Sequence, residues 1–285
     1  MANMEFIRPD SLKAAINFLA KKGAETCIIA GGTDVMVEMR AGKVNSKFLM
    51  DISKLNELKR IELTEEGLIV GAGVTLSEIF QSEVLRRHAP ALQKAAVYFA
   101  SHQIRNVATI GGNVANCSPC GDTIPPLVIH ESKVILESAE GQRCVPIEQV
   151  ATAPYLCSRR PDEIIVKFIL KPAQVEYSEF QKIGRRKEMA VARMSMAVML
   201  GKDAAGKVSK MFFSLGACTP TPHRITAVED FFIGKTLTQQ TIWDGGRLLA
   251  KKMIEITGRR PSIIYKEPAI QGLFMRILYP MALHE

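Results

Sequence analysis

The sequence predicts an α+β protein with two kinds of region. In the first, short apolar runs of strand character alternate with segments whose apolar residues recur at helical spacing, beginning with residues 12–19. In the second, strand-like segments come first and helical stretches follow from Ile225 onward, a pattern typical of a small antiparallel sheet backed by helices. The character of the chain changes around Lys171-Pro172, where we expect a domain boundary.

The beginning of the chain predicts a strand, a helix and a second strand. Ser11 is a good N-cap for the helix that starts at the next residue, and Gly23 ends this helix before the apolar run at residues 27–29. A further strand is predicted at residues 48–52. This order favours an α/β arrangement at the start of the chain.

A hairpin and two helices are predicted next. Residues 61–63 and 68–73 have strand character and are joined by a turn sequence. Thr75 and Glu78 have the spacing of a capping box, and Pro90 suits the first position of a helix. The apolar faces of both helices are expected to belong to the core.

The remaining strands are predicted from apolar runs and from alternation. Residues 133–137 and 163–170 are apolar runs on either side of a loop rich in proline, arginine and serine. Beyond the expected boundary, residues 175–183 alternate, and residues 194–200 and 211–215 are again apolar. These last three segments are the predicted antiparallel sheet.

The composition is that of an ordinary globular chain of 285 residues, 47% hydrophobic and 23% charged. No apolar run approaches the roughly 20 residues of a membrane-spanning helix, and the polar start of the chain is unlike a signal peptide. We therefore expect a cytoplasmic protein without a membrane partner. The formal charge of +8 comes from small scattered basic groups, and only 6% of the residues are aromatic, so nucleic acid is not an expected partner.

The six cysteines are expected to be reduced, because the chain carries no export signal. Cys117 and Cys120 form the only close pair, and one pair cannot complete a four-cysteine cluster. We interpret them as small buried thiols lining a turn, with a metal or redox role as the alternative. The histidines show neither ligand spacing nor a nucleophile–base set, so no metal ligand and no catalytic residue is assigned.

Two glycine doublets are the most informative motifs in the chain. Gly31-Gly32 and Gly111-Gly112 each follow a segment that we interpret as a strand. Adjacent glycines permit positive φ and let a ligand approach the backbone N–H groups, so two such turns can cradle one pyrophosphate. Either doublet alone could be an ordinary tight turn, and neither matches the nicotinamide fingerprint or the P-loop.

Further motifs accompany these doublets along nearly the whole chain. They are Arg8-Pro9, residues 30–34, 49–52, 71–79 and 103–113, Ser118-Pro119, Gly121-Asp122 and Pro222-x-Arg224. Together they resemble the FAD-binding medium subunits of the molybdenum hydroxylases, the group of xanthine dehydrogenase and aerobic carbon monoxide dehydrogenase. The resemblance implies a PCMH-type FAD-binding domain at residues 1–171, with α/β subdomains at about 1–55 and 56–171. It also implies a C-terminal domain of the CO dehydrogenase flavoprotein type at residues 172–285.

The resemblance also implies where FAD is held. Backbone amides of residues 29–34 and 109–113 would hold the pyrophosphate, as glycine turns can. The side chains of Asn116, Ser118 and Asp122 would bind ribityl or ribose hydroxyls. Ile165 would pack on the cofactor, and Lys182 or its neighbour Gln181 would reach it from the C-terminal domain. The complete set of expected cofactor-binding residues is Ile28, Ile29, Ala30, Gly31, Gly32, Thr33, Asp34, Val35, Thr109, Ile110, Gly111, Gly112, Asn113, Asn116, Ser118, Asp122, Ile165 and Lys182.

Three of these residues have simpler interpretations when the resemblance is set aside. Lys182 is then expected to be a solvent-exposed lysine on an edge strand. Asp34 and Asp122 are then expected to serve in Asx-turns or helix caps, a frequent role for aspartate near glycine. Only the resemblance favours contact with a cofactor.

The resemblance implies an oxidoreductase, the electron-transfer subunit of a xanthine dehydrogenase-like complex. Its FAD would take electrons from [2Fe–2S] centres on a small partner subunit and pass them to NAD⁺ or another acceptor, while a molybdopterin-containing large subunit oxidises the substrate. Because the cofactor supplies the redox chemistry, this chain needs no nucleophile or general acid. The alternatives are a self-contained FAD-dependent oxidase or reductase and, from another class, a non-catalytic nucleotide-binding protein.

Overall fold

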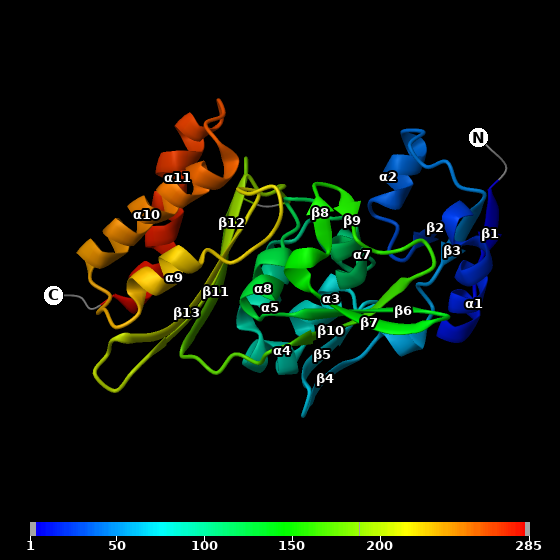
Figure 1. Ribbon diagram of the computed structural model, residues 1–285, viewed down its shortest axis with the longest axis horizontal. Helices are drawn as coiled ribbons and strands as arrows, with labels where there is room; N and C mark the ends of the chain where they lie inside the picture. Colours follow the sequence, from blue (N-terminus) through cyan, green and yellow to red (C-terminus); the bar gives the residue numbers. More distant parts are fainter. Residues whose placement is uncertain (1–3, 188, 283–285) are drawn as a thin grey trace. The chain divides into compact units, whose positions relative to one another are not determined.

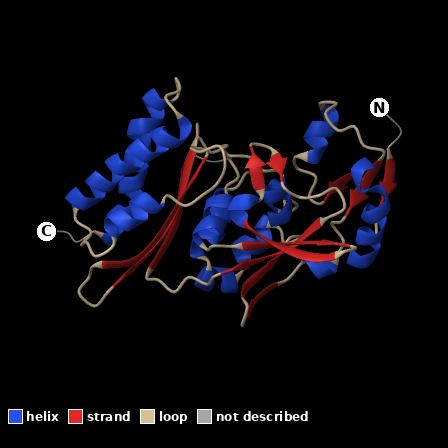
Figure 2. Cartoon of the chain, viewed as in Figure 1, coloured by secondary structure: helices blue, strands red, loops and turns tan. Residues whose placement is uncertain are grey.

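The computed structural model describes residues 4–187 and 189–282, which form two compact units. Figure 1 labels the elements and Figure 2 distinguishes helices from strands. Unit 1 comprises residues 1–84, 101–118 and 132–171, and unit 2 comprises residues 85–100, 119–131 and 172–285. Two segments that precede Lys171 therefore pack with the residues that follow it. The domain ranges expected from the sequence stay a prediction.

Unit 1 begins with a three-stranded parallel sheet. Its order is β1-β3-β2, with strands Glu5–Ile7, Phe48–Asp51 and Thr26–Ile29. Helix α1, Leu12–Lys22, starts at Ser11, whose side chain accepts the Ala14 N–H. Its apolar face, including Leu19, packs in one core with Met50 of β3. The strand, helix and strand predicted at the start of the chain are confirmed.

A five-stranded antiparallel sheet forms the larger part of unit 1. Its order is β4-β5-β10-β6-β7, with strands Ile61–Thr64, Gly67–Gly71, Ile164–Leu170, Lys133–Ser138 and Gly141–Pro146. Strands β4 and β5 are the predicted hairpin. The central strand β10 has a bulge between Ile165 and Lys167, where its pairing with β6 shifts by one residue. A small separate sheet pairs β8, Ala151–Ala153, with β9, Leu156–Cys157.

The segment before the second glycine doublet is helical, so the predicted strand there is wrong. Helix α6, His102–Arg105, precedes the doublet, and Gly111 and Gly112 lie in the first turn of helix α7, Ile110–Ala115. Thr109 caps α7 because its hydroxyl accepts the Gly112 N–H at 3.0 Å. This cap outweighs the low helix propensity of two glycines. Thr75 and Glu78 form the predicted capping box of helix α3, Leu76–Gln81.

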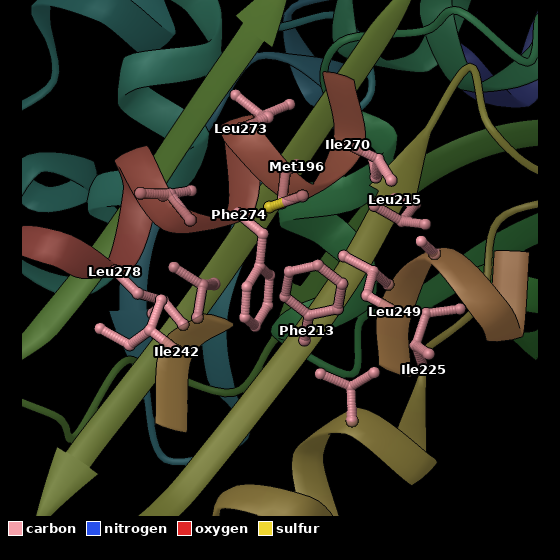
Figure 3. Close-up of a cluster of buried hydrophobic side chains, with 14 of the residues drawn as sticks. Met196, Phe213, Leu215, Ile225, Ile242, Leu249, Ile270, Leu273, Phe274 and Leu278 are labelled. Carbon is pink, nitrogen blue, oxygen red and sulfur yellow. The ribbon is translucent and has the colours of Figure 1, made fainter. Parts of the chain in front are cut away.

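Unit 2 is built on a three-stranded antiparallel sheet, as predicted. Its order is β11-β12-β13, with strands Tyr177–Ile183, Met194–Lys202 and Val208–Gly216. Helices from the end of the chain pack on one face; they are α9, Thr226–Phe232, α10, Gln239–Thr257, and α11, Ile263–Leu278. Figure 3 shows Phe213 and Phe274 packed together in this core, with ring centroids 5.4 Å apart at an interplanar angle of 76°.

The other face of the same sheet is covered by helices from earlier in the chain. These are α5, Pro90–Tyr98, which follows α4, Glu83–His88, and α8, Ile124–Ile129. Along β12, Met196 and Val198 belong to the core with α10 and α11, whereas Ala197 and Met199 pack with α5 and α8. A strand covered on both faces is apolar at successive positions, which explains the unbroken apolar run in the sequence. Within the described residues, no helix combines the length and apolar character that crossing a membrane requires.

Candidate functional site

The first glycine segment links β2 to the short helix α2, Val35–Arg40. Ile28 and Ile29 end the strand, and Gly32 has a φ of +72°, in the left-handed region that favours glycine. The backbone N–H groups of residues 31–34 donate no hydrogen bond to any other group in the described part of the chain. Asp34 occupies the N-cap position of α2, but its side chain forms no capping hydrogen bond. The segment therefore presents consecutive unpaired donors, as expected for an anion-binding turn.

The second glycine segment differs, because its amides already have partners. The N–H groups of Ile110 and Gly111 donate to the carbonyls of Val74 and Ala72, at 3.0 and 2.9 Å. The next two N–H groups, of residues 112 and 113, donate to the hydroxyl and carbonyl of Thr109, each at 3.0 Å. The expectation of unpaired amides at this segment is wrong, since α7 and its cap use them. A role for residues 109–113 in cofactor binding stays a prediction.

The structure does bring the two segments together within unit 1. A Cβ atom built on Gly31 would lie 1.9 Å from the carbonyl oxygen of Val107 and 2.9 Å from the Cα of Ala108. Residues 107 and 108 immediately precede the second segment. Gly31 is required because two stretches of backbone meet there, whereas Gly32 is required by its left-handed conformation.

Gly111 packs against other protein atoms rather than facing a ligand. This predicts that substitutions of the two glycines of α7 differ in their effect on stability. A Cβ on Gly111 would lie 2.7 Å from both the Cβ and the carbonyl oxygen of Ala72, whereas a Cβ on Gly112 would meet only the Thr109 hydroxyl at 3.0 Å. Both substitutions gain the same helix propensity, so any difference in stability comes from packing. We expect Gly111→Ala to be about 2 kcal/mol less stable than Gly112→Ala. Urea unfolding of both variants measures this difference, and equal stabilities would contradict the packing argument.

The other expected residues of unit 1 lie on three elements. Val35 opens α2, and Asn116 is the C-cap of α7, with its N–H bonded to the Gly112 carbonyl at 3.0 Å. Ser118 follows two residues later and is half-buried. Ile165 lies on β10 at the bulge and is 6% exposed. Their contact with a cofactor stays a prediction.

The remaining two expected residues form a buried ion pair inside unit 2. The Lys182 Nζ donates to the Asp122 Oδ2 at 2.6 Å, and the two side chains are only 7% and 8% exposed. The interpretation of Lys182 as a solvent-exposed lysine is therefore wrong, although its strand β11 does lie at the edge of the sheet. Gln181 points elsewhere, since its side-chain oxygen accepts the Arg276 Nε at 2.6 Å.

Only one oxygen of the Asp122 carboxyl group accepts a hydrogen bond within the described residues. Its Oδ1 is buried and has no hydrogen-bond partner among residues 4–187 and 189–282. Burial raises the pKa of Asp122 to about 6, against the opposing effect of the nearby Lys182 charge. A buried oxygen without a donor is costly and indicates a missing partner, such as a hydroxyl group.

The structural role of the Pro222-x-Arg224 motif was not predicted from the sequence. The Arg224 Nε donates to the Glu229 carboxylate at 3.0 Å, and the same carboxylate accepts the Phe213 N–H at 2.7 Å. Another guanidinium nitrogen of Arg224 bonds to Glu131 at 3.1 Å. The motif thus joins β13, α9 and the segment after α8 within unit 2, which is a structural role. The spacing of these residues along the chain does not predict this hydrogen-bond network.

All six cysteines are free thiols. The buried Cys117 thiol donates to the Val114 carbonyl at 3.3 Å. Within the described residues, no group of three histidine, cysteine or acidic side chains is placed to hold a metal ion.

These features fit a nucleotide cofactor with phosphate and hydroxyl groups. Unpaired N–H groups at residues 31–34 suit phosphate oxygens. Lys182 supplies a buried positive charge, and Asp122 supplies a buried oxygen without a donor. The α+β fold and the donor-rich turn of unit 1 define the class of proteins that bind a phosphate-containing cofactor.

Comparison with known proteins identifies the cofactor. The family described as the FAD binding domain in molybdopterin dehydrogenase matches residues 2–172, and the CO dehydrogenase flavoprotein C-terminal domain matches residues 179–281. The nicotinate dehydrogenase FAD-subunit of Eubacterium barkeri is 30% identical over 282 residues, covering 97% of this chain and 95% of its own length. The xanthine dehydrogenase FAD-binding subunit of Escherichia coli O157:H7 is 34% identical over 238 residues, covering 82% of this chain and 81% of its own length.

A solved structure shows the same fold. Carbon monoxide dehydrogenase from Hydrogenophaga pseudoflava includes a chain that superposes with a TM-score of 0.89 at 23% identity, with 99% of both chains covered. The predicted α+β class is confirmed. The chain belongs to the FAD-binding subunits of the molybdenum hydroxylases, the family of xanthine, carbon monoxide and nicotinate dehydrogenases, and it is an oxidoreductase subunit whose cofactor is FAD. This membership replaces the two alternative functions considered from the sequence.

Proposed function

We propose that this chain receives electrons from [2Fe–2S] centres on a small partner subunit and passes them to NAD⁺ or another acceptor. A molybdopterin-containing large subunit would oxidise the substrate. Bound FAD supplies the conversion between single electrons and an electron pair, so the chain's own residues need only bind and orient the cofactor. The family supports this proposal, and the solved Hydrogenophaga structure is that of a carbon monoxide dehydrogenase that lacks the Mo-pyranopterin moiety of its molybdenum cofactor.

The run of unpaired N–H groups at residues 31–34 is the observation that carries the proposed binding mode. Four consecutive donors without partners can hold the diphosphate of FAD, and Gly32 gives the turn its shape. Asn116, Ser118 and the free oxygen of Asp122 would bind hydroxyl groups of the ribityl or ribose moieties. Lys182 would place a positive charge beside the cofactor and keep Asp122 ionised.

The proposed electron path is tested in two steps. The purified chain is first examined for a bound-flavin absorption spectrum and then titrated with NADH without oxygen. We expect bleaching of the flavin by NADH if NAD⁺ is the acceptor, and bleaching by a reduced iron–sulfur partner in either case. Co-expression is expected to isolate the chain with a molybdopterin subunit and an iron–sulfur subunit. Steady oxidation of an organic substrate by the isolated chain would contradict a subunit role.

A further inference from the structure

A buried row of three residues crosses the sheet of unit 2 at the Lys182 end of β11. Lys182 lies directly opposite Ser195 on β12, and Ser195 lies directly opposite Gly216 on β13. Ala197, two positions along β12 from Ser195, packs in the core with α5 and α8. Because side chains of a strand alternate between its faces and opposite residues share a face, Lys182 and Ser195 lie on the face that α5 and α8 cover.

The Ser195 hydroxyl is buried and has no hydrogen-bond partner in the part of the chain that the structure describes. The neighbouring strand leaves room for it, since a Cβ atom built on Gly216 would lie 2.2 Å from the Ser195 Oγ and 2.9 Å from the Cγ of Pro125 in α8. A buried hydroxyl without a partner destabilises the fold, whereas an alanine in its place would not. No hydrogen bond within the described residues therefore accounts for a serine at this position.

The ion pair next to Ser195 has unused hydrogen-bonding capacity as well. An ammonium group carries three N–H donors. Among residues 4–187 and 189–282, that of Lys182 donates to Asp122 alone, at 2.6 Å. The Asp122 Oδ1 lacks a donor. Native proteins pair nearly all buried polar atoms, so three neighbouring groups with incomplete hydrogen bonding indicate a site that a ligand completes.

We propose that Ser195 is a positioning residue of the cofactor site, and that its hydroxyl holds the Lys182 ammonium group in place when FAD is bound. This inference rests on the binding mode proposed above, in which Asp122 accepts a hydroxyl group of FAD and Lys182 places its charge beside the cofactor. The three N–H donors of Lys182 then have three acceptors, which are Asp122, Ser195 and the cofactor itself.

The side chains of this row are suited to such an arrangement. A serine hydroxyl has three staggered positions about χ1, so it can turn from Gly216 toward Lys182 without a movement of the backbone. The long lysine side chain is flexible, and a second fixed partner defines the direction in which its charge points. A positive charge that is held near a flavin raises the reduction potential of the flavin. Ser195 would therefore act on the cofactor through Lys182.

Ser195→Ala tests the proposal, because its expected effects differ between the free and the loaded protein. The urea midpoint of the FAD-free protein should be unchanged or higher, since no hydrogen bond is lost. We expect the affinity for FAD, measured by quenching of flavin fluorescence, to fall about tenfold, because a hydrogen bond to a charged group is lost. The reduction potential of the bound flavin should shift to a more negative value. Native FAD affinity and potential in this variant would overturn the proposal.

Ser214 is the matched control. It is a fully buried serine on the same face of the sheet, opposite Ala197, but its hydroxyl donates to the His223 carbonyl at 3.1 Å. We expect Ser214→Ala to lower the urea midpoint of the FAD-free protein and to bind FAD with native affinity. If Ser195→Ala instead lowered the midpoint as Ser214→Ala does, and both variants lost affinity to the same extent, Ser195 would have only a structural role.

A double variant tests whether Ser195 acts through Lys182. Lys182→Gln keeps a donor for Asp122 but removes the charge, so we expect it to fold and to bind FAD more weakly. Adding Ser195→Ala to Lys182→Gln should cause no further loss of affinity, because the charge that Ser195 positions is gone. A further tenfold loss in the double variant would contradict the positioning role.

The same variants separate failure of this inference from failure of the proposed binding mode. Native FAD affinity in Lys182→Gln would refute the proposed role of Lys182, and the role of Ser195 with it. Weak binding by Lys182→Gln together with native binding by Ser195→Ala would refute only the role of Ser195.

Discussion

Replacing Gly32 by valine is expected to remove most of the FAD from the purified protein, lowering its affinity by about 100-fold. Gly32 has a φ of +72°, and a β-branched residue in this conformation is strained by about 1–2 kcal/mol. Its Cβ would also lie 3.1 Å from the Ile29 Cδ1 and 3.3 Å from the Met36 Cγ. Relief of this strain would turn the N–H groups of residues 31–34 away from the diphosphate. Losing two charge-assisted hydrogen bonds of about 1.5 kcal/mol each corresponds to the expected loss of affinity.

Gly42 provides the matched control for this prediction. Its φ of +69° is nearly the same, but a Cβ there would meet nothing within 4 Å, and the residue lies outside the expected site. Gly42→Val should therefore lose similar stability and keep its flavin. The ratio of flavin to protein absorbance and the quenching of flavin fluorescence on titration measure occupancy and affinity. Equal FAD retention in the two variants would mean that residues 31–34 do not hold the cofactor.

Replacing Lys182 by methionine is expected to lower the free energy of unfolding by about 3–5 kcal/mol, because it leaves the Asp122 carboxylate buried without its partner. Lys94→Met is the control, since Lys94 also pairs with a carboxylate, Glu179, but is 43% exposed. We expect that variant to lose no more than about 1 kcal/mol. A double variant, Lys182→Met with Asp122→Leu, removes both charges and should recover most of the stability while still failing to bind FAD normally.

The pH dependence provides a second test of the buried pair. In the native protein the folded pKa of Asp122, about 6, lies above its ordinary value of 3.8. Folding therefore favours the protonated acid, and this contribution is present below the ordinary value and lost as pH rises through about 6. Without Lys182 the pKa of Asp122 should rise further, so Lys182→Met should be more harmful at pH 8 than at pH 5. Urea unfolding of the FAD-free proteins at both pH values measures this, and a cost independent of pH would contradict it.

Local patterns were sufficient to predict much of the fold and the conformation of the first glycine turn. The hairpin of β4 and β5, the cap at Ser11 and the capping box at Thr75 depend only on neighbouring residues, and all three are confirmed. The left-handed turn at Gly32 was likewise visible, because only glycine adopts that conformation at little cost. The strand predicted before Gly111 failed because residues 102–105 form the helix α6, whose first turn is capped by the Ser101 hydroxyl.

The residues alone specified the order of helices and strands, the turn with its unpaired donors and the family to which the chain belongs. Only the tertiary structure decided that Lys182 is buried against Asp122, and that helices α5 and α8 cover one face of the β12 sheet. The physical reason is that helical and strand periods and caps act over a few residues. Burial, ion pairing and the pKa of a side chain instead depend on which distant segments pack around it.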